Sequence, residues 1–174
     1  MKKILIPLFL LGTGFMMYMM SATSSLLKTP ETKAGIINLE LANTTAKTSA
    51  ILHAWAPTAT TDRIDIAKIN TWWDLLFLFF YAGLLYLLCN FIADNTAGFM
   101  SKAGYLIANA AIIAGICDVM ENTGMLFSLY GLVSPIVSFC TAFFSVIKWC
   151  LVVIAVLYVL VGLLVVAWRK VTNK

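Results

Sequence analysis

Residues 149–168 read WCLVVIAVLYVLVGLLVVAW, a run without a charged residue that ends at Arg169 and Lys170. A helix needs roughly 20 apolar residues to cross the hydrocarbon core of a bilayer, which is about 30 Å thick. This run meets that requirement, and basic residues at its end are typical of a span that stops on the cytoplasmic side. The stretch therefore predicts a membrane-spanning helix.

Three more predominantly apolar runs precede it, at residues 4–20, 72–91 and 103–121. Together the four runs predict an all-α membrane protein, a four-transmembrane-helix bundle that forms a single membrane domain over residues 1–174. The first run follows Lys2 and Lys3, as the apolar part of a signal peptide would. Its length and the poor cleavage residue Met20 favour a retained anchor instead.

The composition excludes an ordinary water-soluble domain. The 174 residues are 61% hydrophobic and 11% charged, whereas soluble domains are roughly 45–50% apolar and about 25% charged. The net charge is +4, but the basic residues do not cluster in one run, so we expect no nucleic-acid partner. The four cysteines Cys89, Cys117, Cys140 and Cys150 lie in or beside apolar runs without a C-x-x-C motif, so we expect free thiols and no zinc site.

Basic residues near the span ends predict the orientation in the cell membrane, since positive charge stays on the cytoplasmic side. With both termini cytoplasmic, the inner set is Lys2, Lys3, Lys102, Arg169, Lys170 and Lys174. Residues 21–71 are then extracytoplasmic, and their basic residues are spread out and interleaved with acidic ones. The sequence predicts a multi-pass protein with this topology.

The extracytoplasmic part is predicted to contain more helix. Between residues 34 and 55, apolar side chains recur near helical spacing, which predicts an extracytoplasmic amphipathic helix that ends before Pro57. It either covers the bundle or binds a partner or lipid. Thr61 or Asp62 is expected to cap the helix of the second span, and residues 122–148 are expected to form a helical hairpin extension that turns at Ser134 and Pro135.

Four charged residues interrupt the predicted spans at one depth. Counted from the expected inner ends at Asp94, Lys102 and Arg169, a rise of 1.5 Å per residue places them about 24–32 Å along their helices. They are Asp74, Asp118, Glu121 and Lys148. Ionisable groups at membrane depth are costly unless they are paired or hydrated, so this layer near the outer leaflet surface is the candidate site.

Neighbouring polar residues extend the predicted layer. One face of the third span carries Gly104, Ala108, Ala111, Gly115, Asp118 and Asn122, and small residues let helices approach closely, so we expect this face to point into the bundle. Tyr81 shares a face with Asp74 and can donate a hydrogen bond. Glu40 either lies above the layer as a lid or is a solvated surface residue.

Three carboxylates facing one lysine leave a surplus of negative charge. Either a carboxylate carries a proton or a bound cation balances the layer. Carboxylate and amide oxygens without histidine suit Ca²⁺ or Mg²⁺ better than zinc, so Asp74, Asp118 and Glu121 are possible ligands of a divalent cation. A layer that only locks the bundle together needs no such ion.

Several short patterns in the chain resemble those of a known family. They are Leu39-Glu40-Leu41-Ala42, then Ala54-Trp55, then Trp73-Asp74-Leu75-Leu76-Phe77 with Tyr81, then Asp118-x-x-Glu121-Asn122. Over about residues 35–125 the sequence resembles a family of small, uncharacterised bacterial four-span membrane proteins. The resemblance implies a four-span fold and points to the residues of the predicted layer, but it implies no activity.

Three functions remain open. The first is an accessory or structural membrane component of undetermined activity, with membrane protein partners or as a homo-oligomer. The second is a lipid-directed membrane enzyme that uses the outer-leaflet carboxylates and needs a groove open to lipid between the second and third spans. The third is a small transporter or channel subunit. No G-x-S-x-G, H-E-x-x-H or P-loop motif is found in the sequence.

Overall fold

The computed structural model describes residues 2–58 and 61–172, and all regular structure in this part of the chain is helical. The helices are α1 (Lys2–Leu26), α2 (Ile36–Glu40), α3 (Thr45–Ala54), α4 (Arg63–Asp94), α5 (Phe99–Leu129) and α6 (Pro135–Thr172). Four of them, α1, α4, α5 and α6, are long and apolar enough to cross a membrane. The chain is thus an all-α, multi-pass membrane protein.

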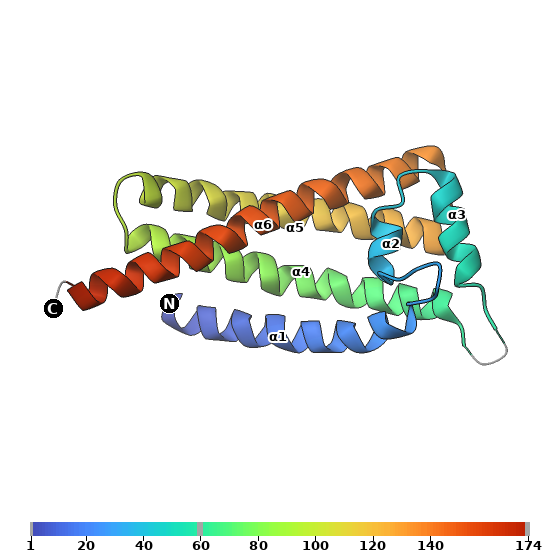
Figure 1. Ribbon diagram of the computed structural model, residues 1–174, viewed down its shortest axis with the longest axis horizontal. Helices are drawn as coiled ribbons and strands as arrows, with labels where there is room; N and C mark the ends of the chain where they lie inside the picture. The colour runs from blue at the N-terminus through green and yellow to red at the C-terminus, as the bar shows by residue number, and fades with distance from the viewer. Residues whose placement is uncertain (1, 59–60, 173–174) are drawn as a thin grey trace.

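The four long helices run along one another, as Figure 1 shows. Helix α5 packs against both α4 and α6, while α1 packs against α4. The two termini and the α4–α5 loop lie at one end of the bundle, here called the terminal end, and α2 and α3 cover the other, here called the capped end (Figure 1). Helix α1 is a peripheral member, because few of its residues are buried inside the protein.

Local hydrogen bonds explain where two of the long helices, α4 and α6, begin. The carboxylate of Asp62 accepts a hydrogen bond from the amide of Asp65, so Asp62 is the cap that the sequence predicts for α4. Helix α6 begins at Pro135, where the missing amide proton costs no helical hydrogen bond, and the Ser134 hydroxyl accepts from the amide of Val137. Both helices therefore extend well beyond the apolar spans.

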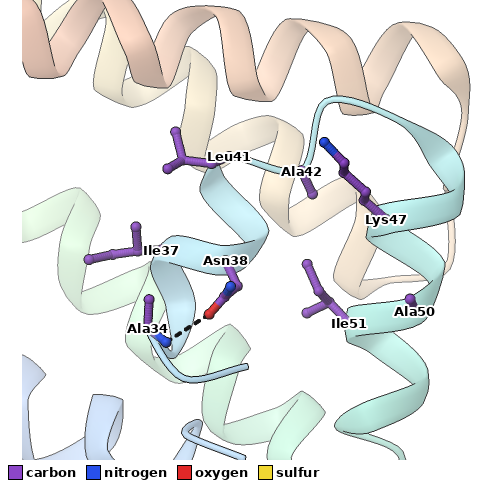
Figure 2. A pocket seen from close by; sticks show the side chains of 8 residues that line it. All are labelled: Ala34, Ile37, Asn38, Leu41, Ala42, Lys47, Ala50 and Ile51. Atoms are coloured by element: carbon purple, nitrogen blue, oxygen red, sulfur yellow. Dashed lines mark hydrogen bonds between the residues drawn. The ribbon is translucent and has the colours of Figure 1, made fainter. Parts of the chain in front are cut away.

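The prediction of a single amphipathic helix over residues 34–55 is wrong, because the segment folds as α2 and α3 with a break at residues 41–44. Thr44 has an extended backbone, and its hydroxyl accepts a hydrogen bond from the amide of Lys47, which starts a new helix. Figure 2 shows the shallow pocket between the two helices. It is lined by Ala34, Ile37, Asn38, Leu41, Ala42, Lys47, Ala50 and Ile51.

A small apolar core holds the capped end together. It contains Leu27, Ile36, Leu39, Trp55, Ala67, Met125 and Leu129, from α2, α4, α5 and the segments that flank the short helices. Trp55 is fully buried, and its indole N–H donates to the carbonyl of Leu27 at 2.9 Å and to the hydroxyl of Thr32 at 3.1 Å. The segment after α1 is thus fixed to the end of α3.

A second apolar core fills the terminal half of the bundle between α4, α5 and α6. The small-residue face predicted on the third span points into it, because Gly104, Ala108, Ala111 and Gly115 are all buried. A Cβ atom added at Gly104 would lie 2.8 Å from the Cβ of Ala93 and would also meet the Tyr158 hydroxyl. The helices thus approach closely here, and the interior at this level is apolar. The buried polar residues nearer the capped end are the exception.

Candidate functional site

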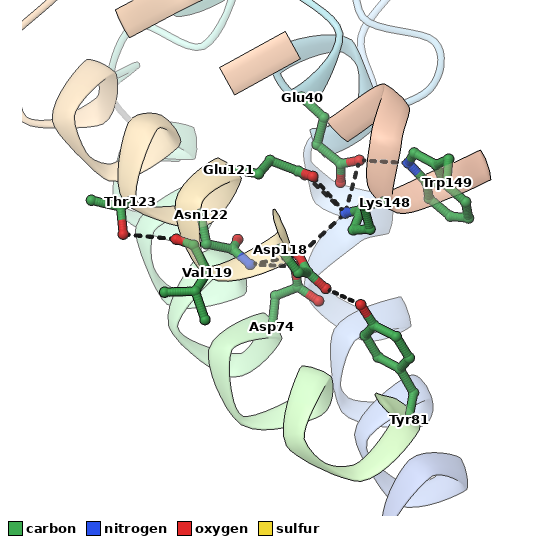
Figure 3. A network of polar contacts seen from close by, with 10 residues as sticks. All are labelled: Glu40, Asp74, Tyr81, Asp118, Val119, Glu121, Asn122, Thr123, Lys148 and Trp149. Atoms are coloured by element: carbon green, nitrogen blue, oxygen red, sulfur yellow. Dashed lines mark hydrogen bonds and ion pairs between the residues drawn. The ribbon is translucent and has the colours of Figure 1, made fainter. Parts of the chain in front are cut away.

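Four acidic residues and one lysine meet in the interior near the capped end, as Figure 3 shows. They come from four helices: Glu40 from α2, Asp74 from α4, Asp118 and Glu121 from α5, and Lys148 from α6. All five side chains are buried. These residues, together with Tyr81, Asn122 and Trp149, are here called the acidic network.

Lys148 lies at the centre of the acidic network. Its Nζ is 2.9 Å from Oε1 and 2.8 Å from Oε2 of Glu121, and it is 3.2 Å from Oδ1 of Asp118. It is also 3.7 Å from Oε2 of Glu40. A single ammonium therefore serves three carboxylates in a medium where charges interact strongly.

Two neutral side chains complete the bonding of the aspartates. The Tyr81 hydroxyl donates to Oδ2 of Asp118 at 2.7 Å. The Asn122 amide donates to Oδ1 of Asp118 at 3.0 Å and to Oδ2 of Asp74 at 2.9 Å, so it joins α5 to α4. Hydrogen bonds to a charged acceptor are stronger than those between neutral groups, which favours this fixed arrangement.

Glu40 belongs to the acidic network and is not a solvated surface residue, because its side chain is buried. Its Oε2 accepts a hydrogen bond at 3.2 Å from the indole N–H of Trp149. The Lys148 ammonium also lies 5.2 Å from the centre of the Trp149 ring. Trp149 was expected only as the first residue of a span, and its position next to Lys148 is the signal that could have indicated this role.

Asp74 differs from the other three acids. Its hydrogen bond comes from Asn122, and no lysine or arginine in the described part of the chain lies within ion-pair distance of it. The side chain is nevertheless buried, with 7% of its surface exposed. An ionised carboxylate here would lack the cation that its neighbours share.

The hypothesis of a divalent cation remains a prediction. Within the residues that the structure describes, no group of three or more His, Cys, Asp or Glu side chains has an arrangement that could hold a metal ion. The space that Asp118 and Glu121 face is occupied by the ammonium of Lys148. A Ca²⁺ or Mg²⁺ ion bound by Asp74, Asp118 and Glu121 would have to displace this lysine. All four cysteines are free.

A cavity of about 550 Å³ adjoins the acidic network and extends toward the terminal end. Helices α1, α4 and α6 form most of its wall, and α2 lies at its polar end. Asp74, Asp118, Lys148 and Glu40 are among the lining residues, whereas most of the remaining wall is apolar. The apolar lining includes Met17, Phe77, Leu84, Leu85, Val152 and Val156.

Asn70, which sequence reasoning missed, lies one helical turn before Asp74 and lines the same cavity. Its amide nitrogen donates to the Thr23 hydroxyl at 2.6 Å and to the carbonyl of Met20 at 3.2 Å, which ties α4 to α1. Its Oδ1 is buried and has no hydrogen-bond partner among the residues that the structure describes. The four-residue spacing from Asp74 is the sequence signal that could have found it.

Polar residues on α6 continue from Lys148 toward the capped end. Ser138 bonds to Thr48 of α3 through their hydroxyl groups at 2.9 Å, and both side chains are buried. Ser145 lies between Ser138 and Lys148, and its hydroxyl is buried without a partner. This polar stripe faces the interior of the protein and docks α3 onto α6.

Comparison with protein-family models, with curated proteins and with solved structures finds no match to this chain. The resemblance to the four-span bacterial family stays a prediction. The acidic network and the cavity beside it are the features of the molecule that bear on function.

Proposed function

We propose that this chain is an integral protein of the cell membrane that binds a membrane lipid. The lipid's apolar tail would occupy the cavity between α1, α4 and α6, and its headgroup would face the acidic network. One observation carries the proposal: the wall of a single cavity is acidic at one end and mostly apolar along the rest. A volume of about 550 Å³ is within the roughly 300–1,000 Å³ of ligand pockets.

The proposed topology places the acidic network in the outer leaflet. Both termini would be cytoplasmic and residues 21–71 extracytoplasmic, as the distribution of basic residues favours. Helices α2 and α3 would then lie at the outer membrane surface. Ile37 and Leu41 support this placement, because both are apolar, exposed and located on the covering segment.

The proposed role is that of an accessory or structural membrane component rather than a transporter. Paired charges of the acidic network fill the interior near the capped end. Toward the terminal end, an apolar core fills the space between α4, α5 and α6. A transport path would need polar groups through that half. Membrane protein partners or a second copy of the chain would act through the exposed apolar faces of the long helices.

Lipid retention tests the proposal. The wild-type protein is purified in a mild non-ionic detergent, and bound lipids are identified by native mass spectrometry. Val152→Trp fills the cavity and is expected to remove the bound lipid, whereas Val153→Trp, at an exposed neighbour outside the cavity lining, is expected to retain it. Equal lipid content in both variants would contradict the proposal.

A lipid-directed enzyme is the second candidate, and one observation favours it. Asp74, Tyr81, Asp118 and Lys148, all able to transfer or hold a proton, line the cavity that would hold the lipid. The enzyme hypothesis required a groove between the second and third spans. The cavity instead lies mainly between the first, second and fourth spans. Incubation with labelled lipid and Mg²⁺ or Ca²⁺ tests this candidate, which predicts a product that Asp118→Asn abolishes.

A further inference from the structure

We propose that the lipid carries a protonated amine in its headgroup and that Asp74 binds this amine. This inference rests on the proposed lipid-binding function and adds the chemical class of the headgroup. Its basis is the joint position of Asp74 and Asn70 on the face of α4 that lines the cavity. Both residues line the cavity, each has a side-chain oxygen that can accept a hydrogen bond, and no lysine or arginine of the described residues pairs with either oxygen.

The charges of the acidic network leave Asp74 without a partner cation. Lys148 contacts Glu121, Asp118 and Glu40, so its ammonium is already surrounded by three carboxylates. Within the described part of the chain, the only hydrogen bond to the Asp74 carboxylate comes from the neutral amide of Asn122. Since a buried carboxylate is stable when it is paired, a cation supplied by the ligand would complete the acidic network.

Asn70 supplies the second observation. Its amide nitrogen must face α1, because the Met20 carbonyl that it contacts can only accept a hydrogen bond. Oδ1 is therefore the atom left without a partner, in a side chain that is 1% exposed. A primary ammonium has three N–H donors and no acceptor, which matches the carboxylate of Asp74 and the free oxygen of Asn70.

The same arrangement disfavours an anionic headgroup. A phosphate next to Asp74 would face a carboxylate, and the nearest ammonium, that of Lys148, is held among three other acids. A hydroxyl headgroup could bond to Asp74 but would not balance its charge. The expected order of affinity is therefore amine, then alcohol, then phosphate.

Three single-chain amphiphiles that differ only in the headgroup test the inference: hexadecylamine, hexadecanol and hexadecyl phosphate. Each is added to the delipidated full-length protein in non-ionic detergent, and bound ligand is measured by native mass spectrometry. The wild type is expected to bind the amine about tenfold to a hundredfold more tightly than the alcohol, because one charge-assisted contact is gained. The phosphate is expected to bind most weakly.

Asp74→Asn is expected to remove the preference for the amine while alcohol binding persists. Glu31→Gln, at an exposed acid outside the cavity lining, is the matched control and should keep the preference. Thermal unfolding of both variants shows whether they fold. The comparison of the three amphiphiles on the wild type decides the question even if Asp74→Asn does not fold.

The outcomes separate this inference from the function on which it rests. Equal binding of amine and alcohol by the wild type, with both lost in Val152→Trp and kept in Val153→Trp, would overturn the amine and leave lipid binding supported. Binding that is the same in Val152→Trp and Val153→Trp would overturn lipid binding itself. A preference for the amine that survives in a folded Asp74→Asn protein would show that Asp74 is not its partner.

Discussion

Lys148 supports the acidic network because its ammonium is the charge that three buried carboxylates share. Removing one member of a buried ion pair leaves the other charge uncompensated and typically costs about 3–5 kcal/mol. Its three partners lie on α2 and α5, while the lysine is on α6. The side chain therefore acts on the packing of three helices at once.

Replacing this lysine by methionine keeps most of its length and removes its charge. Lys148→Met is expected to lower the free energy of unfolding by about 3–5 kcal/mol, since it leaves several acids unpaired. Thermal or denaturant unfolding in detergent measures the change. Lys68→Met is the control, because Lys68 pairs with the exposed Asp65 and such pairs contribute about 0–1 kcal/mol. Equal effects of the two variants would show that the acidic network does not depend on Lys148.

Trp55 carries a second residue-scale prediction. Trp55→Phe keeps an aromatic ring but leaves the Leu27 carbonyl and the Thr32 hydroxyl without the indole N–H. We expect a loss of about 0.5–1.5 kcal/mol, the net contribution of a hydrogen bond, because the Thr32 hydroxyl still donates to the Leu27 carbonyl. Hydrogen exchange of the amides in residues 27–40 measures it. Trp72→Phe, at a side chain that is 57% exposed, should leave that exchange unchanged.

The residues of the acidic network could largely be predicted, for a physical reason. Charge is rare in an apolar helix, so Asp74, Asp118, Glu121 and Lys148 are conspicuous, and the constant helical rise gives their depth. Asn70 and Trp149 carry no charge, so only weaker signals mark them: the four-residue spacing of Asn70 from Asp74, and the position of Trp149 next to Lys148. Their roles depend on which neighbour they face, and that is decided by packing between helices.

At the scale of the element, the long helices were easier to predict than the short ones. An uncharged run of about 20 residues has few alternatives to a spanning helix. The segment 34–55 has no such constraint, because its apolar residues on either side of residues 43–44 keep a near-helical spacing although Thr44 caps a new helix there. Its fold is decided by the Thr44 side chain and by the burial of Leu39 and Trp55, which period analysis does not include.

Helix contact at Gly104 yields a prediction for α5. Gly104→Ala would place a methyl group against Ala93 of α4 and the Tyr158 hydroxyl of α6, so these helices would have to separate. Overpacking of this kind is expected to cost about 1–3 kcal/mol. Unfolding in detergent measures the loss. Gly14→Ala in α1 is the matched control, because its added Cβ would meet no described atom within 4 Å apart from its chain neighbours and the adjacent backbone of its own helix; a similar loss there would assign the effect to the backbone.

The whole molecule is a three-helix unit of α4, α5 and α6 with α1 attached along α4. The number of spans follows from the sequence, but which helices flank the cavity does not, because apolar faces look alike from every side. The polar residues at one end of the cavity could therefore be predicted, whereas the position of the cavity between α1, α4 and α6 could not. Both parts are needed for the lipid-binding proposal.

Topology is the prediction at this scale. In a cysteine-free background, Thr58→Cys is expected to react with a membrane-impermeant maleimide on intact spheroplasts, because residues 21–71 would face outward. Thr172→Cys, exposed near the terminal end, is expected to react only after permeabilisation. The opposite pattern of labelling would reverse the proposed orientation and place the acidic network in the inner leaflet.

The order of the chain has a consequence for biosynthesis. Asp74 and Asp118 precede Lys148 in the sequence, so translation delivers these acids, with Glu121, to the membrane before their shared cation exists. Until α6 is inserted, the carboxylates have to stay hydrated near the membrane surface or carry protons. Lys148 itself enters with the final helix and finds its partners already present. The last span thus supplies the cation that Glu40, Asp118 and Glu121 share, and a chain truncated before α6 exposes these acids unpaired to membrane quality control.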